Sequence, residues 1–245
     1  MFYLTLPSNS SADVYPENKV NNFTVKLPHT IDLQGQWEVG LVEIQYPHTW
    51  YNIQEHEAWM LIKTSPDGPS YRTYLKPGQY DSEGKLIRLL NEVNEDIPDH
   101  RKVVFFYDQI THKVKLDIEF GATIEISDTL QRMLGLSHKQ FKEGVYLGAH
   151  TIDVDQGFYS LYVYCSLVAP RFVGDSQVPL LRIVPIKGKD GNTITKTYEN
   201  VHYLPMSMKN FETVELDLRD DTGKNIPFER GKVVVTLHLR QRPLL

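Results

Sequence analysis

The sequence predicts an all-β protein, a single jelly-roll β-sandwich with two short helices in its connections. Three observations predict this fold: apolar residues recur at every second position, turn sequences separate these segments, and only two segments have helical periodicity. The chain has 245 residues, of which 41% are hydrophobic and 23% charged, so it can bury a large core. We count about eight to eleven strands, a number that fits two packed sheets with Greek-key connections.

The clearest strands have one apolar and one polar face. Apolar side chains occupy alternate positions, as expected for a strand that lies on a core and faces water on its other side. These segments are residues 23–27, 113–118, 213–218 and 232–240. We interpret residues 2–6 as the first strand, in preference to an arm that reaches a neighbouring subunit.

Three further strands are apolar on both faces. In residues 37–46 the apolar parity switches part-way, which predicts a β-bulge or a strand that passes between contact layers. Residues 161–167 place Tyr162 and Tyr164 opposite an aliphatic face, and residues 103–107 have no polar face. Aromatic side chains that face outward need a covering layer, which is a loop, a helix or a neighbouring subunit.

The two predicted helices have recognisable ends. The first begins after the N-cap Ser82 and ends before Pro98. The second is short, with Ser127 or Asp128 as its cap and Gly135 as its stop. Their apolar stripes are formed by Leu86, Leu90, Val93 and Ile97, and by Leu130, Met133 and Leu134.

Composition limits the domain count and the class of partner. No repeat or linker divides the chain, so we expect one domain over residues 1–245, with a possible small insertion around residues 80–135. The formal net charge of −5 argues against a nucleic-acid coat, and no apolar run is long enough to span a membrane. The N-terminal residues do not resemble a signal peptide, so we expect folding in a reducing compartment.

Motifs for catalysis, cofactor binding or metal binding are not found. The nine histidines never lie two positions apart, as metal-binding jelly rolls require. Cys165 lies in the middle of an apolar strand, where we expect a buried thiol rather than a nucleophile. We interpret Asp220-Asp221-Thr222-Gly223 as turn chemistry. The sequence therefore predicts a protein that is not an enzyme and needs no cofactor.

A carbohydrate- or receptor-binding sandwich is the alternative function. Lectins with this fold use exposed aromatic residues, and Trp50-Tyr51-Asn52 is the candidate segment. Aromatic packing under a loop is the interpretation that we favour for these residues.

Segments along nearly the whole chain resemble one family in the same order. The resemblance is to the minor capsid (penton) proteins of Polinton/Maverick elements and related adintovirus-like viruses. The residues that carry it are 22–28 (NFTVKLP), 37–44 (WEVGLVEI), 50–53 (WYNI), 130–136 (LQRMLGL), 179–185 (PLLRIVP), 219–224 (RDDTGK) and 231–240 (GKVVVTLHLR).

The resemblance implies a structural virion protein. It implies a jelly roll that forms homopentamers at the fivefold vertices of an icosahedral capsid, beside a double jelly-roll major capsid protein. A pentamer is a heterologous ring, in which one patch meets a different patch on the next copy. The candidate interface residues are Phe105 and Tyr107 on one patch, and Tyr162 and Tyr164 on the other. Cover by loops of the same chain remains an equal alternative.

Overall fold

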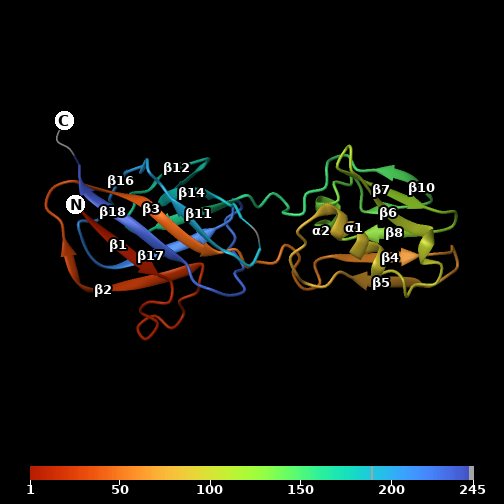
Figure 1. Ribbon diagram of the computed structural model, residues 1–245, viewed down its shortest axis with the longest axis horizontal. Coiled ribbons are helices and arrows are strands. Elements are labelled where there is room, and N and C mark those ends of the chain that lie inside the picture. Colours follow the sequence, from red (N-terminus) through yellow and green to blue (C-terminus); the bar gives the residue numbers. More distant parts are fainter. Residues whose placement is uncertain (189, 243–245) are drawn as a thin grey trace. The chain divides into compact units, whose positions relative to one another are not determined.

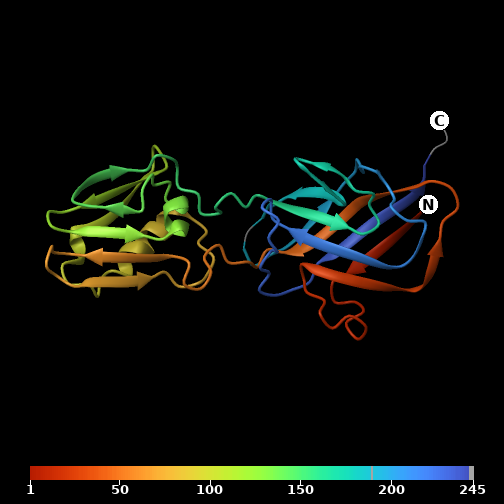
Figure 2. The same cartoon turned by 180° about the vertical axis from the view of Figure 1, so that it is seen from behind.

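A computed structural model describes residues 1–188 and 190–242, which form two compact units (Figures 1 and 2). Unit 1 comprises Met1–Trp50 and Phe158–Leu245, and unit 2 comprises Tyr51–Gly157. The prediction was one domain with a possible insertion around residues 80–135. The inserted unit spans more residues than this predicted insertion. It contains a separate apolar core that shares no buried residue with the core of unit 1.

Unit 1 is a sandwich of two antiparallel sheets around one core (Figure 1). The chain passes repeatedly from one sheet to the other, so most neighbouring strands are distant in sequence. In order across the first sheet lie β1 (Phe2–Pro7), β18 (Val234–Gln241), β3 (Trp37–Pro47) and β15 (Thr193–Thr197), with β16 (Leu204–Pro205) also paired to β3. The second sheet contains β14 (Leu180–Pro185), β11 (Ser160–Cys165), β17 (Asn210–Arg219) and β2 (Asn22–Asp32).

The parity switch in β3 is a β-bulge, as predicted. Thr236 of β18 pairs with Glu43, and Leu237 pairs with Leu41, so Val42 is the extra residue. The bulge lets Leu41 and Ile44 both face the core, although they are three positions apart. The predicted first strand is confirmed too, because β1 pairs with β18 along its whole length.

Unit 2 has two smaller antiparallel sheets with helices packed against them. The side chain of Asn91 receives a hydrogen bond from the backbone N–H of Phe105 and donates one to its carbonyl oxygen, at 3.0 and 2.9 Å. Helix α1 (Glu83–Glu92) thereby satisfies the backbone groups of Phe105 on the open edge of β6 (Val103–Asp108). The sheets contain β10 (Gly144–Leu147), β7 (Lys113–Ile118) and β6 (Val103–Asp108), and β5 (Ser70–Tyr74), β4 (Trp59–Lys63), β8 (Thr123–Ile126) and β9 (Gln140–Phe141).

Both predicted helices are present, and both lie in unit 2. Helix α1 (Glu83–Glu92) starts after Ser82 but ends earlier than predicted, because residues 94–97 form turns. Helix α2 (Asp128–Met133) has Ser127 as its N-cap, whose hydroxyl accepts a hydrogen bond from the Leu130 backbone N–H. A short 3₁₀ helix, η1 (His100–Lys102), and the hairpin of β12 (Arg171–Val173) and β13 (Ser176–Val178) complete the elements. The prediction of an all-β jelly-roll sandwich with two short helices is confirmed.

The two neighbouring phenylalanines of β6 provide a direct test of this packing. Phe105 is 1% exposed and Phe106 is 47% exposed. We expect Phe105→Ala to lower the free energy of unfolding of unit 2 by about 3–5 kcal/mol, because it removes a ring from a closed core. The control Phe106→Ala should cost no more than about 1 kcal/mol. Urea denaturation of the whole chain measures both, and equal losses would contradict the strand parity.

His238 is a buried titratable group on the outer side of the first sheet of unit 1. Its ring stacks on Tyr3, and its Nδ1 lies 2.7 Å from the hydroxyl of Tyr203. The other ring nitrogen, Nε2, is buried without a hydrogen-bond partner. Burial, the positive charge of the N-terminus and that of Arg240 lower the pKa of His238 below its ordinary value of 6.5.

The lowered pKa of His238 predicts acid sensitivity. The unfolded chain binds a proton at His238 near pH 6.5, whereas the folded chain binds it only at lower pH. The contribution of neutral His238 to stability should therefore be fully present above pH 6.5, and it should be lost as the pH falls through the lowered pKa of the folded state. In His238→Gln this side chain no longer titrates, so the loss of stability between about pH 7 and 5 should be smaller. Thermal unfolding across this range checks it, and identical profiles would contradict the role of His238.

Candidate functional site

The structure separates the four candidate interface residues into two pairs. Phe105 and Tyr107 lie on β6 of unit 2, and Tyr162 and Tyr164 lie on β11 of unit 1. Phe105 is a core residue, so its assignment to a contact surface is corrected here. Tyr107 is half-buried against the same core, and its hydroxyl is 2.7 Å from Nδ1 of His112.

The register of the β6–β7 hairpin explains this correction. Phe105 pairs with the buried Leu116, and Phe106 pairs with Lys115, whose ammonium lies 5.2 Å from the Phe106 ring centroid. A run of apolar residues does not show which of its side chains face the core. The polar and apolar residues of β7 alternate, so its register with β6 shows which residues of β6 are buried.

Sequence reasoning missed a second exposed face in unit 2. Val145 and Leu147 project from the edge strand β10, on the same side of the sheet as Phe106. All three are exposed, and between them β7 presents an ion pair of Lys115 and Asp117 at 3.5 Å. We call Phe106, Val145 and Leu147 the β10 patch. The alternation of residues 145 and 147 is the sequence signal for it, but it covers too few residues to identify a strand.

Tyr162 and Tyr164 line a hollow on the outer side of the second sheet of unit 1. The aliphatic residues of β11 face the core, and the two tyrosines are half-buried on the opposite side, as predicted. The walls of the hollow come from β11, β17, the β12–β13 hairpin and the turn after β17. The hollow has a volume of about 790 Å³, which lies within the usual range for ligand sites. We call it the tyrosine groove.

The electrostatics of the tyrosine groove are dominated by carboxylates. Asp217 accepts two hydrogen bonds from Arg219 on one oxygen, Oδ2, at 2.6 and 2.7 Å. Its other oxygen, Oδ1, is buried and has no hydrogen-bond partner. Burial raises the pKa of Tyr164, so its hydroxyl is neutral and able to donate at physiological pH. The described residues thus supply no hydrogen-bond donor to Oδ1 of Asp217.

Two of the three residues in the alternative carbohydrate segment are packed against the chain, whereas Tyr51 is 40% exposed. Trp50 is 4% exposed, and its ring lies against His48, Phe158 and Phe228. The side-chain amide of Asn52 bonds to the backbone of Tyr80 and of Val154, which ties loops of unit 2 together. Packing under loops, the interpretation favoured from the sequence, therefore holds for Trp50 and Asn52.

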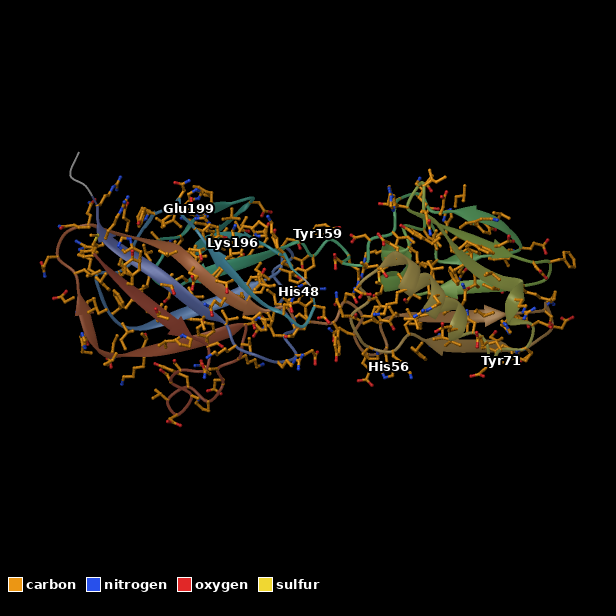
Figure 3. All side chains as sticks on the ribbon, in the orientation of Figure 1. His48, His56, Tyr71, Tyr159, Lys196 and Glu199 are labelled. Carbon is orange, nitrogen blue, oxygen red and sulfur yellow. The ribbon has the colours of Figure 1, made fainter. Side chains whose placement is uncertain are left out.

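The described residues contain no cluster suited to a metal ion. Within residues 1–188 and 190–242, no three His, Cys, Asp or Glu side chains converge on one point. His48 belongs to unit 1 and His56 to unit 2 (Figure 3). Asp220 Oδ1 accepts hydrogen bonds from the backbone N–H groups of Thr222 and Lys224, which confirms the predicted turn chemistry. No helix in the described part of the chain is long and apolar enough to cross a membrane.

Cys165 is buried in the core of unit 1, as predicted, and burial raises the pKa of its thiol to about 12. A thiol in this setting is a poor nucleophile, because the thiolate is the reactive form.

The burial of Cys165 predicts low reactivity. In native buffer near pH 8 we expect no labelling by Ellman's reagent over hours, and full labelling of the single thiol in guanidinium chloride. The denatured sample is the control for an intact thiol. Rapid labelling of the native protein would contradict the buried position.

Comparison with known proteins identifies a similar fold. No protein-family model matches the chain, and no curated protein matches its sequence. The crystal structure of the selenomethionine-labelled mavirus penton protein is similar with a TM-score of 0.50 and 13% sequence identity, over 97% of this chain and 98% of that chain. At this identity the similarity establishes the fold. The D2–D3 domains of the flagellar cap protein FliD from Escherichia coli align with a TM-score of only 0.19 and 11% identity, over 98% and 100% of the two chains, and carry no argument.

Proposed function

We propose that this protein is a penton, a minor capsid subunit that forms pentamers at the fivefold vertices of an icosahedral capsid. Its neighbours there would be double jelly-roll major capsid proteins, and its location the virion. Within this proposal it belongs with the penton proteins of Polinton/Maverick elements and adintovirus-like viruses, which its sequence segments resemble. Its role is structural and not catalytic.

One observation carries the proposal: the similarity to the mavirus penton protein extends over 97% of the chain. It therefore includes residues of both unit 1 and unit 2, whereas a shared sandwich alone would account only for unit 1. A similarity that includes an inserted unit favours a common role over a general likeness between β-sandwiches.

The surfaces of the two units support an assembly role. A closed ring needs two different patches on each subunit. The β10 patch offers one candidate ring surface, with exposed apolar side chains on an edge strand. The tyrosine groove offers half-buried aromatic rings and carboxylates, which suit contact with a neighbouring coat protein. Exposed apolar area of this kind is typical of protein–protein contacts. We assign the β10 patch to contacts between copies, and Tyr107, Tyr162 and Tyr164 remain candidate contact residues.

Oligomeric state tests the proposal. We expect native mass spectrometry to give five copies of the 28.3 kDa chain, and electron microscopy to show fivefold rings, at least when a double jelly-roll major capsid protein is co-expressed. A strictly monomeric chain that ignores that partner would overturn the proposal.

A paired substitution tests the β10 patch. We expect Val145→Asp with Leu147→Asp to shift the assembly towards monomers, because charge is placed at an apolar contact. The control Ile110→Asp changes an exposed apolar residue that lies in a turn outside the patch, so it should leave the mass unchanged. Pentamers that persist in the double variant would remove the β10 patch from the contact.

A further inference from the structure

The tyrosine groove carries a large excess of negative charge. Its lining includes four carboxylates and one guanidinium, which leaves three negative charges in one hollow. The whole chain has a formal net charge of −5. A neutral ligand would leave this charge unbalanced, whereas a cationic ligand would be attracted to it. The charged residues of the lining are Asp175, Glu215, Asp217, Asp221 and Arg219.

Among the described residues, no ring or cation stacks on the aromatic rings of the groove. Elsewhere the chain covers outward aromatic rings with its own arginines: the Cζ of Arg182 lies 3.5 Å from the ring centroid of Tyr198, and that of Arg240 lies 3.5 Å from that of Tyr203. Within the described part of the chain, no cation and no aromatic ring stacks on Tyr162 or Tyr164. The two rings that face the groove are thus free to receive a cation from outside.

One carboxylate oxygen of the lining is closed to a ligand. Oδ1 of Asp217 is buried and has no donor, although Arg219 bonds Oδ2 of the same carboxylate. Because this oxygen has no exposed surface, a ligand does not reach it, and Arg219 is the donor that holds the Asp217 side chain at the groove. A guanidinium meets the requirements of charge and of stacking at once, since it is positively charged and planar.

We propose that the tyrosine groove binds an arginine-bearing extended segment of a neighbouring coat protein of a different kind, not of a second copy of this chain. The guanidinium stacks on Tyr162 or Tyr164, while the exposed carboxylates of Asp175 and Asp221 attract the segment from the rim. A second copy is the poorer partner because it carries the same negative net charge. This inference rests on the proposed function for the identity of the partner and on the groove for its chemistry.

Peptide binding to the isolated full-length chain tests the inference. The probe is a short fluorescein-labelled Gly/Ser peptide with two arginines one residue apart, measured by fluorescence anisotropy. Its matched control has citrulline in place of arginine, which keeps the shape and removes the charge. We expect the citrulline peptide to bind at least about tenfold more weakly, and the arginine peptide to bind more weakly as salt is raised.

Variants locate the binding in the groove. Tyr164→Leu should weaken binding of the arginine peptide by about tenfold or more, because it removes the ring. Asp175→Asn with Asp221→Asn removes two exposed rim charges, so it should weaken binding several-fold without loss of folding. The control Asp67→Asn removes an exposed carboxylate of unit 2 and should leave binding unchanged.

Any one of four binding results would overturn the inference: no binding of the arginine peptide at millimolar concentration, equal binding of the citrulline peptide, binding that the groove variants leave unchanged, or binding of neutral oligosaccharides only. Loss of pentamers in Tyr164→Leu without the major capsid protein would also overturn it, because a second copy would then occupy the groove. Pentamers without peptide binding would leave the proposed function standing. Peptide binding by a strict monomer would instead contradict only the assembly role.

Discussion

The closure of the sandwich in unit 1 depends on strand parity. Successive side chains of a strand point to opposite faces, so the residues that β11 gives to the core leave Tyr162 and Tyr164 outside. The same constraint on β6 places Phe105 inside and Phe106 outside. What remains on the surface for contacts is therefore a consequence of how each core is closed. The β-bulge at Val42 is the place where β3 breaks this parity, and it keeps both Leu41 and Ile44 in the core.

The two units contribute different kinds of surface. The β10 patch of unit 2 is apolar with a central ion pair, which suits contact with another apolar face. The tyrosine groove of unit 1 is aromatic and acidic, which suits a cation on a narrow segment. In the function that we propose, these two chemically distinct surfaces would serve contacts with copies of this chain and with a different coat protein.

Burial also explains why two candidate functional side chains are not available on the surface. The thiol of Cys165 is held in the core with a raised pKa, and Trp50 is packed among aromatic rings. The side chains of Cys165 and Trp50 thus serve the interior. Asp217 is different, because it belongs to the lining of an open hollow, although its Oδ1 is buried without a hydrogen-bond partner.

Much of the fold was determined by the sequence alone. Alternation predicted the strands, caps predicted both helices, and the parity switch predicted the bulge in β3, because these are local properties of neighbouring residues. The tertiary structure decided the division into two units, the burial of Phe105 and the β10 patch. The groove around Tyr162 and Tyr164 also appears only there, since it joins residues of β11, β17 and the β12–β13 hairpin. These features depend on register and on contacts between distant segments, and no local pattern specifies either.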